Sequence, residues 1–144
     1  FRGWDGIAAE LKGVEINYIP LSTEPALDYY TPVLISRDAL IEQEPELVRS
    51  FLRAVSRGYD FAIGNPEEAA DILLEAAPEL DRQLVVASQR YLAGEYRADS
   101  PRWGEMKLEV WERYAAWLDG NGLLEGGFSA PEAFTNDFLP DYPN

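Results

Sequence analysis

The stretch PELVRSFLRAVSRGYDFAIGNPEEAADIL, residues 45–73, has the pattern of two amphipathic helices separated by a short stop. In its first part apolar residues recur every three or four positions, at Leu47, Val48, Phe51, Leu52, Val55, Tyr59 and Ile63. Pro45 suits the first position of a helix, because the N–H that it lacks has no intrahelical partner there. Gly64 and Pro66 mark the stop and the restart, with Asn65 between them as the expected N-cap. The stretch therefore predicts a helical scaffold whose apolar stripe faces a core.

Helical patterns recur on both sides of this stretch, and the sequence predicts about six helices in total. The remaining helices should cover residues 5–11 before Gly13, a short turn after Ser36 as N-cap, residues 84–92 before Gly94, and about residues 107–119. The aromatic residues after position 127 should dock on the body of the protein. Trp103, Trp111 and Trp117 are interpreted as core residues and not as an aromatic cage, because two of them lie on an amphipathic helix.

Two segments instead have the pattern of strands: VEINYIP, residues 14–20, and YYTPVLIS, residues 29–36. In the first, apolar and polar side chains alternate, as in a half-buried strand. Two strands do not form a stable sheet by themselves, so their partner strands are expected elsewhere. The predicted fold class is therefore α/β, predominantly helical with about two strands, as a piece cut from a larger protein.

Composition excludes several classes of function. The chain has 144 residues with 12 basic and 26 acidic side chains, a formal net charge of −14, which disfavours nucleic acid as a partner. It contains no Cys and no His, which excludes thiol catalysis, imidazole acid–base chemistry and most zinc sites. No Asp-rich loop has calcium-type spacing, so no metal and no cofactor is expected. No apolar run approaches the roughly 20 residues that span a bilayer.

Four blocks follow one another along the chain: YYTPVLISRDALIEQEPELVRSFLRAVSRGYDFAIGNPEEAADIL (29–73), ASQRYL (87–92), WGEMKLEVWERYAAWLDGNGLLE (103–125) and AFTNDFLP (133–140). Their order resembles the second half of the SsuA/THI5-like solute-binding proteins, whose fold is that of type II periplasmic binding proteins. Within that superfamily the chain most resembles members that bind formylaminopyrimidine, a thiamine precursor. They are specific for the superfamily but weak for the ligand, because core packing alone explains scaffold helices.

The resemblance implies a fragment of a protein with two lobes around a cleft. Residues 1–28 would close the second lobe, and residues 29–144 would return to the first lobe and wrap helices on it. Such a protein is the non-catalytic substrate-binding component of an ABC importer. It is located in the periplasm or elsewhere outside the cytoplasm, and in some cases a lipid anchor attaches it to the membrane. Its partners would be a small planar heterocycle and a membrane permease.

Three candidate ligand-binding residues lie in RGWDG, residues 2–6, where the resemblance places the chain at the cleft. Trp4 would stack on a flat ring, and the alternative is a core or lobe-interface aromatic. Asp5 would accept a hydrogen bond from an exocyclic amine, and the alternative is a helix N-cap or dipole partner. Arg2 is a third candidate, for which a solvated surface charge is the competing interpretation.

Tyr29 and Tyr30 complete the candidate set, because the crossover strand of these proteins often presents an aromatic to the cleft. Adjacent side chains on a strand point to opposite faces, so at most one of the two would reach the ligand. Core packing would take the other.

Three other hypotheses remain open at this point. A receptor of the same fold could bind riboflavin or an alkanesulfonate. Relatives in the same superfamily synthesise the thiamine pyrimidine with a histidine and a cysteine-rich stretch near the crossover strand, but residues 26–36, ALDYYTPVLIS, contain no cysteine. Finally, two copies of the chain could associate to satisfy exposed strand edges.

Overall fold

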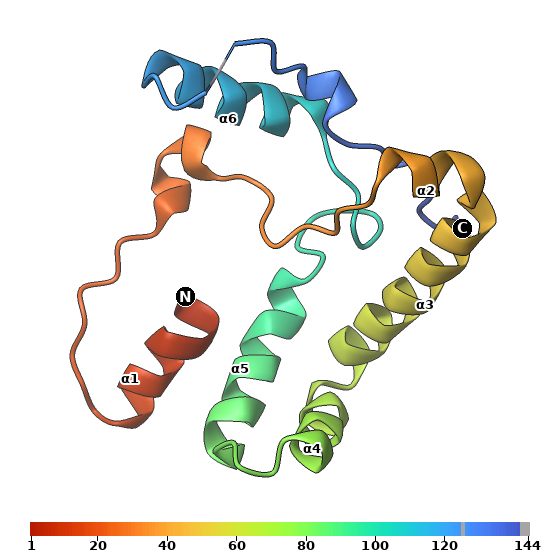
Figure 1. Ribbon diagram of the computed structural model, residues 1–144. Coiled ribbons are helices and arrows are strands. Elements are labelled where there is room, and N and C mark those ends of the chain that lie inside the picture. Colours follow the sequence, from red (N-terminus) through yellow and green to blue (C-terminus); the bar gives the residue numbers. More distant parts are fainter. Residues whose placement is uncertain (125, 142–144) are drawn as a thin grey trace. The chain divides into compact units, whose positions relative to one another are not determined.

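The computed structural model describes residues 1–124 and 126–141, and these residues are mostly helical. The α-helices are α1 (Ile7–Leu11), α2 (Asp38–Gln43), α3 (Pro45–Gly64), α4 (Pro66–Ala76), α5 (Arg82–Glu95) and α6 (Leu108–Gly120), labelled in Figure 1. A π-helical turn, η1 (Arg2–Gly6), leads into α1, and short 3₁₀ turns form η2 (Leu21–Thr23), η3 (Pro25–Leu27) and η4 (Ala130–Glu132). The prediction of a predominantly helical chain is confirmed.

The two predicted strands are not formed. In the part of the chain that the structure describes, no residue of 14–20 or 29–36 is paired in a sheet. A strand exists only through backbone hydrogen bonds to a neighbouring strand, and no such ladder joins either segment to another. The alternating side chains remain exposed instead, with Val14 at 54% and Ile16 at 46%. The alternating pattern thus indicated an extended conformation, but it did not indicate whether a neighbouring strand is available for pairing.

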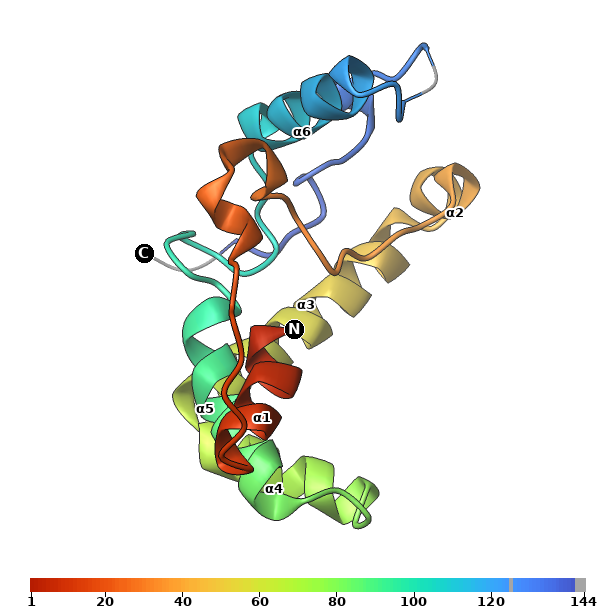
Figure 2. The same ribbon diagram turned by 90° about the vertical axis from the view of Figure 1, so that its left-hand side faces the viewer.

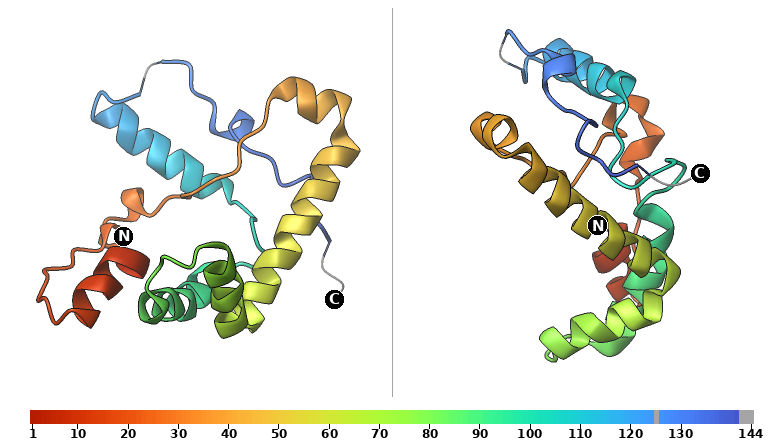
Figure 3. Two further views of the ribbon diagram at one scale, coloured as in Figure 1. Left: turned by 60° about the horizontal axis from the view of Figure 1, so that its bottom comes forward. Right: turned by 90° about the vertical axis from the view of Figure 1, so that its right-hand side faces the viewer.

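The helix-forming stretch at 45–73 folds as expected. α3 has 20 residues, and its ribbon is continuous in Figure 3. Asn65 occupies the N-cap position of α4, as the sequence predicts, but its side chain forms no capping hydrogen bond to that helix. Its side-chain amide donates to the carbonyl of Phe61 at 3.1 Å and so completes the end of α3. The predicted end at Gly13 is confirmed, because this glycine has a φ of +67° after α1.

Two other predicted helix ends are wrong by one or two residues. Arg37, not Ser36, occupies the N-cap position of α2, and the Ser36 hydroxyl donates to the Arg37 carbonyl. α5 continues through Gly94 to Glu95, because a single glycine costs a helix only about 1 kcal/mol. Its start is capped by Asp81, whose carboxylate accepts from the backbone N–H of Leu84 at 2.8 Å.

The chain forms two compact units, and α3 contributes residues to both. The first unit comprises Phe1–Tyr18 and Arg53–Trp103, and the second comprises Ile19–Leu52 and Gly104–Asn144. The predicted division at residue 28 concerns lobes of a larger protein and stays a prediction.

In the first unit α4 and α1 both pack against α5 (Figures 1 and 2). Two ion pairs join α4 to α5: Arg82 contacts Asp71 at 2.5 Å, and Arg90 contacts Glu67. Because the four side chains are between 49% and 66% exposed, each pair contributes about 0–1 kcal/mol. Ala70 on α4 and Val85 on α5 are both buried, as expected of apolar residues in packed helices.

In the second unit α6 packs against η3 and η4. The predicted docking of the aromatic tail is confirmed, since Phe134 stacks on Trp111 with ring centroids 5.7 Å apart. The Asn136 side chain also forms two hydrogen bonds to the backbone of Met106, at 3.0 Å and 2.7 Å. The tail is therefore held by an aromatic stack and by a paired amide contact.

Candidate ligand-binding site

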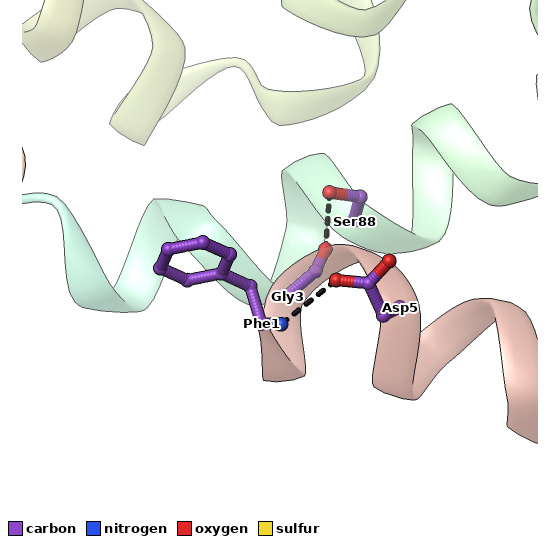
Figure 4. A network of polar contacts seen from close by, with 4 residues as sticks. All are labelled: Phe1, Gly3, Asp5 and Ser88. Atoms are coloured by element: carbon purple, nitrogen blue, oxygen red, sulfur yellow. Dashed lines mark hydrogen bonds and ion pairs between the residues drawn. The ribbon is translucent and has the colours of Figure 1, made fainter.

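The site is built where η1 meets α5 in the first unit. Gly3 has no side chain, and a Cβ there would lie 2.9 Å from Cδ2 of Leu92 and 3.2 Å from Cδ1 of Tyr91. The glycine therefore lets the two backbones approach closely. Figure 4 shows the result: the buried Ser88 hydroxyl donates to the carbonyl of Gly3 at 2.5 Å. This hydrogen bond joins residues 85 positions apart and fixes the start of the chain on α5.

Beside this contact lies a hollow of about 550 Å³ that opens to solvent, which we call the Trp4 hollow. It is lined by Phe1, Arg2, Gly3, Trp4, Asp5, Tyr18, Ser88, Tyr91, Leu92 and Glu95. The lining combines four aromatic rings with two carboxylates and a guanidinium. The structure thus brings together three of the five residues predicted from the sequence, which are Arg2, Trp4 and Asp5.

Arg2 is held by several partners at the edge of the hollow and is not the solvated charge that the sequence favoured. Its guanidinium lies 5.8 Å from the ring centroid of Tyr18 and 6.0 Å from that of Tyr91, within the range of cation–π contacts. It also donates to Oε1 of Glu10 at 2.5 Å, a hydrogen bond that raises the pKa of Arg2 above its ordinary value. A Cβ on Gly6 would lie 3.2 Å from this side chain, so the missing Cβ makes room for it.

Asp5 lies inside the first helical turns and does not act as an N-cap, because the helix already begins at Arg2. Its Oδ2 accepts from the amino group of Phe1 at 2.8 Å (Figure 4), and this ion pair lowers the pKa of Asp5. The carboxylate is 73% exposed, so its second oxygen stays accessible at the hollow. Trp4 is 37% exposed and is neither a fully buried core residue nor a free surface one.

Tyr29 and Tyr30 lie in the second unit and do not line the hollow. The Tyr29 ring stacks on Tyr114 with centroids 4.2 Å apart. The Tyr30 hydroxyl accepts from the backbone N–H of Lys107 at 2.8 Å, and its ring tilts toward Trp111 at 6.4 Å. Both tyrosines therefore pack against α6 or the turn before it, and their role as ligand-binding residues stays a prediction.

Sequence reasoning did not identify Tyr18, Tyr91 and Glu95 as parts of the site. Tyr91 lies in the helix predicted over residues 84–92, and it is 37% exposed at the hollow. Its partial burial, with a smaller contribution from Glu95, raises the pKa of Tyr91 above 10.0. One signal was present in the sequence: a glycine such as Gly3 at the start of a helix permits the close approach of another element.

The described part of the chain holds neither a cluster of metal ligands nor a membrane-crossing helix. In residues 1–124 and 126–141, no group of three or more acidic side chains is placed to hold a metal ion. Among the same residues, no helix combines the length and apolar character needed to cross a bilayer.

Comparison with known proteins shows the family of this chain. Residues 1–69, which include Arg2, Trp4, Asp5 and Tyr18, match the family described as NMT1/THI5 like. The chain belongs to the NMT1/THI5-like family. Of the residues that line the hollow, those on α5 lie outside this match, which covers only its N-terminal side.

Curated relatives extend the similarity of this NMT1/THI5-like chain to most of its length. It is 33% identical over 136 residues to the riboflavin-binding protein RibY of Chloroflexus aurantiacus, which covers 90% of this chain and 38% of the relative. It is 30% identical over 129 residues to the formylaminopyrimidine-binding protein of Halalkalibacterium halodurans, covering 87% and 39%.

A third relative is the 4-amino-5-hydroxymethyl-2-methylpyrimidine phosphate synthase of Legionella pneumophila, 31% identical over 104 residues, covering 70% of this chain and 31% of the relative. The chain therefore spans no more than about two fifths of the length of these proteins. Two of the three are named for binding a small heterocycle, and the third for synthesising one.

Proposed function

We propose that this chain is part of the substrate-binding component of an ABC importer that captures a small planar heterocycle, specifically a pyrimidine precursor of thiamine. The observation that carries the proposal is the alignment of 87% of the chain with a formylaminopyrimidine-binding protein. The absence of His and Cys agrees with a receptor that binds its ligand without transforming it.

The chemistry of the Trp4 hollow supports a flat ligand with N–H donors. An aromatic ring that stacks on Trp4 gains about 0.5–1.5 kcal/mol beyond the area that it buries. An exocyclic amine that donates to the free oxygen of Asp5 forms a charge-assisted hydrogen bond of about 1.5–3 kcal/mol. An aminopyrimidine offers both features in one small ring.

In this proposal the two-lobed fold of periplasmic binding proteins supplies the rest of the cleft. Residues 1–28 belong to one lobe, and residues 29–144 return to the other. Tyr29 or Tyr30 then presents a ring to the ligand from the crossover segment. Hinge closure around the ligand produces the form that a membrane permease recognises, and the protein acts outside the cytoplasm.

Riboflavin is the second candidate ligand, because the relative named for riboflavin binding covers 90% of the chain. An isoalloxazine ring has a larger stacking surface than a pyrimidine but lacks an exocyclic amine. Asp5 would therefore contribute more to binding of an aminopyrimidine than to binding of riboflavin. The synthase similarity favours a third possibility, and a test for pyrimidine phosphate formation separates it from binding alone.

The proposal is tested on the complete protein, whether that is this chain or a longer one that contains it. Thermal-shift measurements with formylaminopyrimidine, hydroxymethylpyrimidine, riboflavin and an alkanesulfonate should show stabilisation by a heterocycle. Asp5→Asn should weaken aminopyrimidine binding by about tenfold or more, since it removes the charge from the acceptor. The control Asp119→Asn changes an exposed aspartate at the end of α6 and should have no effect. Stabilisation by none of the heterocycles would show the proposal to be wrong.

A further inference from the structure

The charged groups at the Trp4 hollow are paired unevenly. Among the side chains that line the hollow, Arg2 carries a positive charge, and Asp5 and Glu95 carry negative charges. Arg2 contacts Oε1 of Glu10, which lies outside the lining, at 2.5 Å. Glu95 lines the hollow as well and forms no ion pair with any described residue. The unpaired charge at the hollow is therefore negative.

Arg2 is also restrained geometrically. The rings of Tyr18 and Tyr91 both lie about 6 Å from its guanidinium carbon, and only 30% of the side chain is exposed. An anionic ligand would therefore meet a guanidinium whose charge Glu10 already balances and whose movement the two rings restrict. Its gain from Arg2 is smaller than its gain from an unpaired guanidinium would be.

The charge of the whole chain acts in the same direction. The formal net charge is −14, and this field extends over about a Debye length of 8 Å at physiological ionic strength. A phosphate ester or a sulfonate would bring further negative charge to Glu95. A neutral ring with N–H donors would instead find acceptors in Glu95 and Asp5.

Resting on the function proposed above, we infer that the Trp4 hollow selects its ligand by charge: it takes uncharged or cationic heterocycles and excludes their phosphate esters and anionic sulfonates. Glu10 has a specific role in this selection, because it neutralises Arg2 from outside the lining of the hollow. Glu10 is thus a specificity residue that does not touch the ligand.

Matched ligand pairs test this inference on the complete protein. Hydroxymethylpyrimidine is compared with its phosphate, and riboflavin with riboflavin 5′-phosphate, by isothermal titration calorimetry at low and at physiological salt. The wild type should bind the uncharged member about tenfold tighter, a preference that decreases as salt rises. Glu10→Gln keeps a hydrogen-bond acceptor for Arg2 but removes the charge, and should reduce the preference to about threefold or less.

The control Glu15→Gln makes the same change in net charge at an exposed residue outside the hollow, and should leave the preference unchanged. Equal or tighter binding of the phosphate esters by the wild type would overturn the inference while leaving the proposed function intact. An equal effect of both variants would overturn the role of Glu10. Failure of both members of each pair to bind would overturn the proposed function and the inference together.

Discussion

The buried hydrogen bond between Ser88 and Gly3 is the contact whose removal should disturb the site most directly. In Ser88→Ala the Gly3 carbonyl loses the hydrogen bond from the Ser88 hydroxyl. Water does not readily replace the hydroxyl, because Ser88 is only 3% exposed. A buried acceptor that loses its partner costs about 1–3 kcal/mol. Alanine returns about 0.5 kcal/mol through its higher helix propensity in α5. The expected net loss is therefore about 1–2 kcal/mol in the free energy that holds η1 on α5.

Hydrogen exchange measured by mass spectrometry locates this loss. A cost of about 1–2 kcal/mol increases the population of the open state by a factor of about 5–30, so amides of α1 should exchange faster by that factor. The amides of α6 lie in the other compact unit and should keep their wild-type rates.

Ser50→Ala is the matched control, because Ser50 is an exposed residue inside α3 and gains the same helix propensity without losing a buried bond. If α1 exchanges at the same rate in Ser88→Ala as in Ser50→Ala, the hydrogen bond does not fix the start of the chain. The account of how the Trp4 hollow is built would then be wrong.

Three further changes test other parts of the structure. Gly3→Ala should destabilise the protein by about 1–3 kcal/mol, because the added Cβ overlaps Leu92. In Gly58→Ala the added Cβ meets no atom within 4 Å, and the change should stabilise the protein by about 0.5–1 kcal/mol; urea unfolding measures the free energy of unfolding of both variants. Asn136→Ala should cost about 1–2 kcal/mol, since both hydrogen bonds to Met106 are lost, and Asn136→Asp should recover only the bond that the side chain accepts. Partial burial raises the pKa of Tyr96 above 10.0, so stability should fall as the pH rises from 10 through that higher value, and urea unfolding of Tyr96→Phe should lack this component.

The long helices could be predicted because their signal is local. Apolar residues every three or four positions predict both the existence of α3 and its apolar face. Asp81 is of a type favoured at the N-cap, and it is the N-cap residue of α5. The details at the helix ends are harder to predict, since α5 continues through Gly94, and Asn65, although it is the N-cap of α4, donates its side-chain amide to the end of α3. The absence of the two strands could not be predicted, because pairing of residues 14–20 requires a neighbouring strand, and a local sequence pattern does not show whether one is present.

The candidate site was predictable only on one side. RGWDG concentrates an aromatic, a cation and a carboxylate at a helix start, which is a local signal for chemistry. Its partners are distant: Tyr91 lies 89 positions after Arg2, and only the packing of η1 on α5 brings them together. The competing assignment of Arg2 to a solvated charge failed for this reason, since the contacts that hold it are tertiary.

Formation of the hollow depends on folding of the helix that carries it. η1 and α1 together span Arg2–Leu11, which is shorter than the roughly 12–15 residues that an isolated helix needs to be even marginally stable. Its stability must therefore come from α5, through the buried Ile7 and the Gly3–Ser88 contact. A ligand that contacts Trp4 on one side and Tyr91 on the other bridges the same two elements. Binding in the hollow should then stabilise the docked helix by mass action, and ligand should slow hydrogen exchange in the same α1 amides that Ser88→Ala accelerates.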